Sequence, residues 1–322
     1  MNQLQEIQSK LEQAKRVAIF THTNPDGDAL GSSFAMKAAL EDLGKSAVVF
    51  LEKEMPEKYN FLNKGYCLSG EASDFDVALA LDCGALGRLG TQESMYQAIQ
   101  TKLVVDHHYS DEPFGDLYYT ETQSAACAEL VYLLIKNMCG VLPASTLIPI
   151  YTGISTDTGQ FKFSNVTPRT HHIAAELLEL GLDHRAITRR IYDTVNLKKL
   201  KFTGVLAEKI KFFHNGKIAA LECFDSFLES YGLSHEEVEE LPNTVLSIEG
   251  VEVSVIIKDK DEDSFKVSMR CKENIDLALL ASCFGGGGHK CAAGFVSELP
   301  LETLTETLVQ EIAKRLEAFY GR

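Results

Sequence analysis

The stretch RVAIFTHTNPDGD at positions 16–28 joins a mostly apolar run to a dense group of polar side chains. Residues 16–21 have the short apolar character of a strand that is buried on both faces. His22, Asp26 and Asp28 follow directly, with a proline and a glycine among them that permit a tight turn. We therefore expect one imidazole and two carboxylates at the carboxyl end of this strand. A second interpretation is that Asp28 serves only as the N-cap of the helix expected after it.

Polar residues also follow three other apolar segments of the chain. They are Asp82 after an expected strand at 77–81, Asp106, His107 and His108 after an expected strand at 103–105, and Asp157 after an expected helix at 144–155. Each of these groups alone has an ordinary explanation as turn or cap residues. Because ligands bind at the carboxyl ends of strands in open parallel sheets, we expect all four groups to meet at one sheet edge.

Carboxylates that converge at one place repel one another unless cations lie among them. Mixed carboxylate and imidazole ligands suit Mn²⁺, with Mg²⁺, Fe²⁺ or Co²⁺ as alternatives. The ligands are numerous enough for two ions, and ions about 3.5–4 Å apart can hold a phosphoryl group and activate water. The sequence therefore predicts a dinuclear metal site for phosphoryl chemistry.

The alternation of short apolar strands with helices predicts an α/β fold for the N-terminal part. We expect a doubly wound, mainly parallel sheet with helices on both faces. The expected strands are 16–21, 47–51, 77–81 and 103–105, and the expected helices are 3–14, 29–43, 124–137, 144–155 and 168–180.

The pattern changes after about residue 185, which predicts a second, smaller α/β domain. We expect a first domain at 1–184, a helical linker at 185–206 and a second domain at 207–322. The expected strands of the second domain are 217–223, 251–257 and 265–271, the last two joined by the charged turn 258–263, and its expected helices are 275–283 and 301–319. The two strands that flank the charged turn indicate an antiparallel hairpin.

The composition excludes several classes of protein. A chain of 322 residues has room for about two domains, and its formal net charge of −15 and pI of about 5.1 argue against a duplex nucleic-acid binder. Eight cysteines without a C-x-x-C pair indicate reduced thiols and a cytoplasmic location. The chain shows neither a secretory signal nor the run of about 20 apolar residues that a membrane span needs.

Two features of the chain could bind the phosphate groups of a substrate. A glycine run is followed by a histidine: Gly285, Gly286, Gly287, Gly288 and His289. Backbone N–H groups without neighbouring Cβ atoms can approach a phosphate closely, although such a run can also be a flexible linker. Arg270 ends an expected strand and Arg88 lies shortly after Asp82. Either arginine could bind a phosphate in bidentate fashion, and a solvated surface position is the alternative for both.

In their order and spacing these motifs resemble the DHH phosphoesterase superfamily, which is named after a motif matching Asp106, His107 and His108. The stretch GGGGHKCAAG at 285–294 is similar to the glycine-histidine motif of DHHA1 domains. The resemblance covers nearly the whole chain. The length, the two-domain layout and the stretch FKFSNVTP at 161–168 are similar to the NrnA-like group of the superfamily.

This resemblance implies a role for each matching residue. One ion would be held by His22, Asp26 and Asp82, and the other by Asp28, Asp82, His107 and Asp157. Asp82 would bridge the ions, Asp106 would orient a ligand or handle protons, and His108 would face the scissile phosphate. Arg270 would contact the terminal phosphate of the substrate. Relatives often carry an acidic or polar residue at or near the position of Ala85. This chain departs from that pattern there, but Asp82 is intact.

The implied activity is hydrolysis of short single-stranded oligoribonucleotides to 5′-mononucleotides, together with removal of the 3′-phosphate from 3′-phosphoadenosine 5′-phosphate (pAp). Soluble phosphodiesterases that cleave the linear dinucleotide pApA have nearly the same layout and are one alternative. A nucleotide-binding regulator without catalysis is another. A homodimer is expected by analogy only, and neither a duplex nor a membrane is an expected partner.

Overall fold

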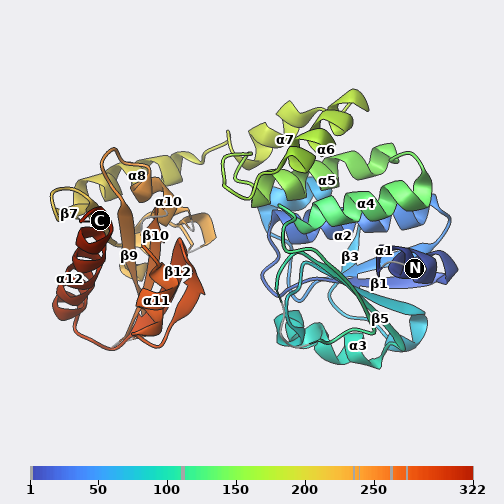
Figure 1. Ribbon diagram of the computed structural model, residues 1–322, viewed down its shortest axis with the longest axis horizontal. Coiled ribbons are helices and arrows are strands. Elements are labelled where there is room, and N and C mark those ends of the chain that lie inside the picture. Colours follow the sequence, from blue (N-terminus) through green and yellow to red (C-terminus); the bar gives the residue numbers. More distant parts are fainter. Residues whose placement is uncertain are drawn as a thin grey trace. The chain divides into compact units, whose positions relative to one another are not determined.

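The computed structural model describes residues 3–109, 113–234, 236–238, 240–261, 264–272 and 275–321. The chain forms two compact units, Met1–Thr194 and Val195–Arg322, each with its own sheet (Figure 1). The division falls between the helices α7 (His184–Ile191) and α8 (Leu197–Lys209), inside the stretch expected to be a helical linker.

The first unit is built on a sheet with the strand order β3-β2-β1-β4-β5-β6, and every pairing in it is parallel. The strands are β1 (Arg16–Phe20), β2 (Ser46–Phe50), β3 (Tyr66–Cys67), β4 (Val77–Leu81), β5 (Thr101–Asp106) and β6 (Leu117–Thr120). The chain winds outward from β1 in one direction and from β4 in the other. The prediction of a doubly wound parallel sheet is confirmed, and its topological switch point lies between β1 and β4.

Helices cover both faces of this sheet because its strands are apolar on both sides. Val17 and Ile19 of β1 enter the larger core, while Ala18 and Phe20 enter a smaller core on the other face. The larger core is covered by α1 (Gln3–Gln13), α2 (Gly27–Asp42), α4 (Cys127–Cys139) and α5 (Ala144–Asp157), and the smaller one by α3 (Glu93–Ala98) and the short turns η2 (Ala72–Asp74) and η3 (Leu86–Gln92) (Figure 1). The remaining elements are η1 (Glu57–Leu62), α6 (Pro168–Glu179) and α7.

The second unit contains a mixed sheet with the order β11-β12-β10-β9-β8-β7. Among the described residues of this sheet, β8 and β9 pair in parallel and the other pairings are antiparallel. The strands are β7 (Lys211–Phe213), β8 (Ile218–Glu222), β9 (Val253–Asp261), β10 (Ser264–Cys271), β11 (Gly287–His289) and β12 (Ala292–Ser297), and the other elements are α9 (Asp225–Ser230), η4 (Glu236–Val238), α10 (Leu241–Leu246), α11 (Leu277–Ser282) and α12 (Leu301–Tyr320). The predicted β9–β10 hairpin is confirmed, while residues 262–263 of its charged turn lie outside the described residues.

The strand β10 separates an apolar core from an open face. Val267 and Met269 pack into the core beneath α11 and α12. Lys266, Ser268 and Arg270 alternate with them and are exposed or half-buried on the other face. This alternation leaves polar side chains on the open face of a strand whose other face packs into the core.

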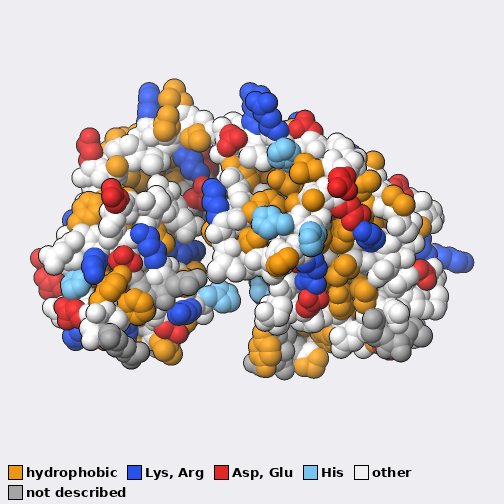
Figure 2. Space-filling model, turned by 45° about the horizontal axis from the view of Figure 1, so that its top comes forward, with side chains coloured by type: hydrophobic (Ala, Val, Ile, Leu, Met, Phe, Trp, Pro, Cys, Tyr) orange, Lys and Arg blue, Asp and Glu red, His pale blue; other side chains and the backbone are white. Residues whose placement is uncertain are grey.

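Two features of the described surface bear on partners. Acidic and basic side chains are interspersed on the face of each unit shown in Figure 2. Among the described residues, no helix is long and apolar enough to cross a membrane.

Candidate metal centre

The loops after β1 and β4 place the first ligands at the switch point of the sheet. His22 is buried shortly after the end of β1, and Asp82 is buried directly after β4. His22 Nε2 lies 3.9 Å from Asp82 Oδ2. The N-cap of α2 is Asp26, whose Oδ1 accepts hydrogen bonds from the backbone N–H groups of Asp28 and Ala29. Asp28 therefore lies in the first turn of α2 and is not its N-cap, because Asp26 already accepts from the first free N–H groups.

Asp28 is instead bound by the start of another helix. Its Oδ2 accepts from Cys127 N at 2.5 Å and its Oδ1 from Ala128 N at 2.9 Å, so the carboxylate sits at the positive N-terminal end of α4. This arrangement needs a close approach of α2 to α5. A Cβ atom on Gly153 would lie 2.7 Å from Asp28 Oδ1, and one on Gly27 would lie 2.4 Å from Thr156. Asp28 and Asp157 can share a site only because these two glycines let the helices touch.

His107 points at three carboxylates from the end of β5. Its Nδ1 lies 3.2 Å from the carbonyl oxygen of Ser124, and because a carbonyl only accepts, Nδ1 carries the proton. Nε2 therefore faces the cluster, and its lone pair would bind a cation once its own proton is displaced. The distances from Nε2 are 3.8 Å to Asp28 Oδ2, 3.5 Å to Asp82 Oδ1 and 3.6 Å to Asp157 Oδ2.

His108 is held by the carboxylate of Asp106. Asp106 Oδ1 accepts from both the backbone N–H and the Nδ1 of His108, at 3.0 and 2.8 Å. Asp106 is buried, whereas the His108 side chain is 36% exposed. The hydrogen bond that His108 donates to Asp106 raises the pKa of the imidazole, although burial opposes this shift. Asp106 thus orients a histidine whose outer edge reaches solvent.

Asp82 has the properties of a metal ligand. Its backbone adopts a left-handed φ of 55°, which is unusual for a residue with a side chain. Its Oδ1 is buried and has no hydrogen-bond partner among the described residues, although His108 Nδ1 lies only 3.4 Å away. An unpaired buried carboxylate oxygen is costly unless a cation binds it. Donor atoms within 4.8 Å of one another define three groups: His22, Asp26 and Asp82; Asp28, His107 and Asp157; and Asp82, Asp106, His107 and His108. This donor set fits divalent cations.

The pKa values of Asp28, Asp157 and His107 are all raised, which shows that positive charge stabilises the cluster. Burial raises the pKa of Asp28 well above its ordinary value, and Asp82 and Asp157 add to the shift. Burial also raises the pKa of Asp157 to about 7. Burial opposes a charge on His107, but the carboxylates around it, Asp82 above all, raise the pKa of its imidazole to about 10. Without cations the cluster retains protons near neutral pH, and divalent ions would replace them.

Arg88 lies at the edge of this cluster. Its backbone carbonyl accepts a hydrogen bond of 2.8 Å from Thr23 N, which ties η3 to the loop that carries His22. Burial lowers the pKa of His22, and the Arg88 charge adds to this effect. The Arg88 side chain itself is exposed.

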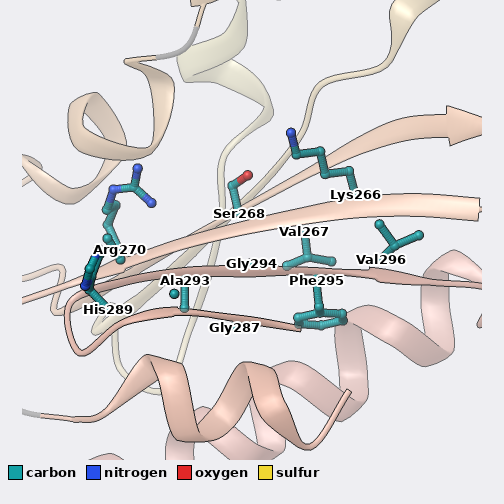
Figure 3. A pocket seen from close by; sticks show the side chains of 12 residues that line it. Lys266, Val267, Ser268, Arg270, Gly287, His289, Ala293, Gly294, Phe295 and Val296 are labelled. Carbon is teal, nitrogen blue, oxygen red and sulfur yellow. The ribbon is translucent and has the colours of Figure 1, made fainter. Parts of the chain in front are cut away.

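The second unit contains an open cavity of about 530 Å³. Its lining consists of Lys266, Val267, Ser268, Arg270, Gly287, Gly288, His289, Ala292, Ala293, Gly294, Phe295 and Val296. Figure 3 shows Lys266, Ser268 and Arg270 on one side of β10, with His289 beside Arg270. Burial lowers the pKa of Arg270, and among the described residues its guanidinium pairs with the carbonyl of Met269 and with no carboxylate. A half-buried cation without a counter-ion suits an anionic ligand.

The structure divides the glycine run into two parts. Gly287, Gly288 and His289 form β11 and line the cavity. Gly285 N and Gly286 N instead donate to Ser282 O and Ala281 O at the end of α11, so these N–H groups are not free for a phosphate. Gly285 and Gly286 are not among the residues that line the cavity.

Sequence reasoning missed Lys266 and Ser268 in this cavity. The alternation of side chains along β10 was the available signal, since it places positions 266, 268 and 270 on one face. In the first unit it missed the backbone around the start of α4, where Ser124 accepts from His107 and Cys127 donates to Asp28. Every residue has a backbone carbonyl, and every residue except proline has a backbone N–H, so residue types do not show which backbone groups will bind a ligand side chain.

Comparisons with known proteins agree with these two units. Residues 16–154 match the family model described as the DHH family, N-terminal domain, and residues 215–321 match the DHHA1 domain. The chain is 29% identical to a Thermus thermophilus protein named bifunctional oligoribonuclease and PAP phosphatase NrnA, over 93% of this chain and 90% of that protein.

Solved structures show the same fold. An exopolyphosphatase-related protein from Bacteroides fragilis superimposes with a TM-score of 0.89 at 25% identity, covering 98% of this chain and 97% of the other. RecJ from Thermus thermophilus, solved in complex with Mn²⁺, has a TM-score of 0.52 at 16% identity, covering 100% of this chain and 55% of RecJ. The motifs, the sheet topology and both family matches together show that this chain belongs to the DHH family and carries a DHHA1 domain in its second unit.

Proposed function

We propose that this chain is a phosphohydrolase that uses two divalent ions, with Mn²⁺ as the preferred ion. Its substrates are short single-stranded oligoribonucleotides, cleaved to 5′-mononucleotides, and pAp, converted to AMP and phosphate. The observation that carries this proposal is Asp82, whose buried Oδ1 has no hydrogen-bond partner among the described residues and lies beside two histidines within a larger cluster of carboxylates. The activities in the name of the Thermus thermophilus relative support the choice of substrates.

The metal ligands divide into two sets. His22, Asp26 and Asp82 would hold one ion, and Asp28, Asp82, His107 and Asp157 would hold the other; this division is supported by two of the groups whose donor atoms lie within 4.8 Å of one another. Carboxylate and imidazole ligands suit Mn²⁺, with Mg²⁺, Co²⁺ or Fe²⁺ as alternatives. When bound, the ions neutralise the charge of the phosphoryl group and make water nucleophilic near neutral pH.

The chain's own side chains orient the group being hydrolysed. Asp106 accepts from Nδ1 of His108 and raises the pKa of the imidazole, so the protonated ring can donate its Nε2–H to a phosphoryl oxygen. Arg88, exposed at the rim, adds positive charge for the same group. These residues stabilise negative charge as the bond to the leaving oxygen breaks.

The cavity of the second unit recognises another part of the substrate. Arg270 presents a planar guanidinium without a carboxylate partner among the described residues, which suits bidentate binding of a phosphate. His289 lies beside it, and Gly287 leaves room for a ligand because a Cβ there would meet nothing within 4 Å. A cavity of about 530 Å³ lies in the usual range for small-ligand pockets, in agreement with short substrates. A cytoplasmic location, a homodimer and the exclusion of duplex substrates stay predictions.

The deciding experiment measures hydrolysis of pAp, pApA and a labelled RNA pentamer by the purified full chain in Mn²⁺. The Asp82→Ala variant is the control, with its fold checked by circular dichroism. Turnover of both pAp and the pentamer, lost in the variant, is the expected result. Turnover of pApA alone would instead identify a dinucleotide phosphodiesterase. Tight nucleotide binding without turnover of any substrate would identify a regulator.

A further inference from the structure

Glu129 is a buried carboxylate that belongs to none of the metal-ligand groups. It is 0% exposed and lies in the first turn of α4. Its Oε1 accepts from Thr170 Oγ1 at 2.5 Å, and its Oε2 accepts from Ser124 Oγ and Arg169 Nε, both at 3.0 Å. A charge so completely removed from water requires partners on both oxygens, and here it has three.

Ser124 connects this carboxylate to the metal centre. Its hydroxyl donates between Glu129 Oε2 at 3.0 Å and Ala126 O at 2.9 Å, while its carbonyl oxygen accepts the Nδ1 proton of His107. Ser124 is buried, so water does not compete for either contact. The hydrogen bond at Nδ1 sets which nitrogen of His107 is protonated and where Nε2 points.

The segment 124–128 also supports the other ligands of the same group. The N–H groups of Cys127 and Ala128 bind the carboxylate of Asp28. The side chain of Asn165 donates to Ala125 O at 2.9 Å and to Asp157 O at 3.1 Å, which joins this segment to the end of α5. One short segment therefore contacts His107 and Asp28 directly and Asp157 through an asparagine.

We propose that Glu129 is a positioning residue for the ion bound by Asp28, His107 and Asp157. By accepting from Ser124 it holds the segment 124–128 in place, and this orients His107 and the N–H groups that bind Asp28. Glu129 is anchored from the opposite side by Arg169 and Thr170 at the start of α6. The inference rests on the proposed function, because it concerns one of the two proposed metal sites.

The test is a Mn²⁺ titration of the metal-free full chain, with free Mn²⁺ measured by electron paramagnetic resonance. Glu129→Ala removes the side-chain acceptor of the Ser124 hydroxyl and leaves only Ala126 O within the segment itself, so one of the two ions should bind about 10–100-fold more weakly while the other stays near its wild-type affinity. Glu129→Gln keeps one acceptor oxygen that can face Ser124, so it should recover most of the lost affinity. A general structural defect would weaken both ions together.

Glu121→Ala is the matched control. Glu121 forms an ion pair with Arg169, in which Oε1 of Glu121 lies 2.7 Å from Nη1 of Arg169. Among the described residues, the Glu121 side chain has no contact with Ser124. Both Mn²⁺ affinities should therefore be unchanged in this variant. Saturating Mn²⁺ should restore the turnover number of Glu129→Ala with an unchanged KM, because Glu129 is placed away from the substrate.

Several results would overturn the inference. A folded Glu129→Ala variant with both wild-type affinities, or with both weakened equally, contradicts it. If that variant does not fold, Ser124→Ala decides, since it removes only the hydroxyl: unchanged affinities then contradict the inference, and weaker binding of one ion supports it. If the wild-type chain binds two Mn²⁺ ions and the variants bind them with the same affinities, this inference is refuted and the proposed function is not. A wild-type chain that binds no Mn²⁺ refutes the proposed function as well.

Discussion

Asp28 Oδ2 accepts a hydrogen bond of 2.5 Å from the backbone N–H of Cys127, which lies 99 residues further along the chain. A carboxylate in the first turn of α2 thus binds the first turn of α4. The same carboxylate lies 3.8 Å from His107 Nε2. The contact that packs two helices together also places a ligand in the metal centre, so packing and metal binding depend on each other at this residue.

Asp28→Asn should impair both properties. An asparagine has one acceptor oxygen, so the N–H of either Cys127 or Ala128 loses its partner, which costs about 1–3 kcal/mol for a buried group. Mn²⁺ affinity should fall by more than the roughly 10–100-fold that follows loss of a supporting residue, because a ligand itself is lost. Titration calorimetry with Mn²⁺ and thermal unfolding check the two effects.

Asp42→Asn is the control for this substitution. Asp42 also lies on α2 and accepts from Ser145 Oγ at 3.0 Å, but this contact is exposed. Its effect on stability should stay within about 0.5 kcal/mol. Equal effects of the two substitutions would contradict the special role of the Asp28 carboxylate.

Gly153→Ala should weaken Mn²⁺ binding without altering any ligand. The added Cβ would lie 2.6 Å from the Cβ of Ala128 and 2.7 Å from Asp28 Oδ1, so α5 must move away from α2 and α4. Overpacking of this kind costs about 1–3 kcal/mol. Gly204→Ala in α8 is the control, because a Cβ there meets nothing within 4 Å and should stabilise the helix by about 0.5–1 kcal/mol. Unfolding midpoints and Mn²⁺ affinities of both variants are the measurements; wild-type behaviour of Gly153→Ala would show that the helices need not touch.

The stability of the metal-free protein should depend on pH through Asp157. Burial raises its pKa from 3.8 to about 7. A carboxyl whose pKa is raised by folding contributes most below its unfolded pKa, and this contribution is lost as the pH rises from about 4 to about 7. With metal removed by EDTA, the unfolding midpoint of the wild type relative to Asp157→Asn should therefore fall across this range and then level off. A constant difference between the two proteins would contradict the raised pKa.

Lys266→Met should affect longer substrates more than pAp. Lys266 and Arg270 point to the same side of β10 and are four residues apart, which corresponds to about 13 Å at the usual rise per residue (Figure 3). A ligand that reaches both must extend beyond one nucleotide. We expect a several-fold higher KM for an RNA trimer, an unchanged turnover number and little change for pAp. Lys260→Met, on β9 and outside the cavity lining, should leave all three values unchanged.

The strands that carry ligands could be predicted closely from the sequence. The expected strands at 16–21 and 77–81 correspond to β1 (Arg16–Phe20) and β4 (Val77–Leu81), because a continuous apolar run that ends at a polar group is a strong local signal. The sequence prediction lacks five strands, which are β3, β6, β7, β11 and β12. β3 has two residues and β11 is rich in glycine, so neither has a local preference for a strand, and each exists because it pairs with a neighbour, β2 or β12.

The sequence by itself determined which donor atoms are available and at which strand ends they lie, since residue types and hydrophobic periodicity are local properties. Only the tertiary structure decided which of these atoms meet. It placed Asp28 on the N–H groups of α4, turned His107 Nε2 toward three carboxylates through the carbonyl of Ser124, and used Gly285 and Gly286 to end α11. These outcomes depend on backbone groups and on close helix packing, and both arise only when distant segments come together.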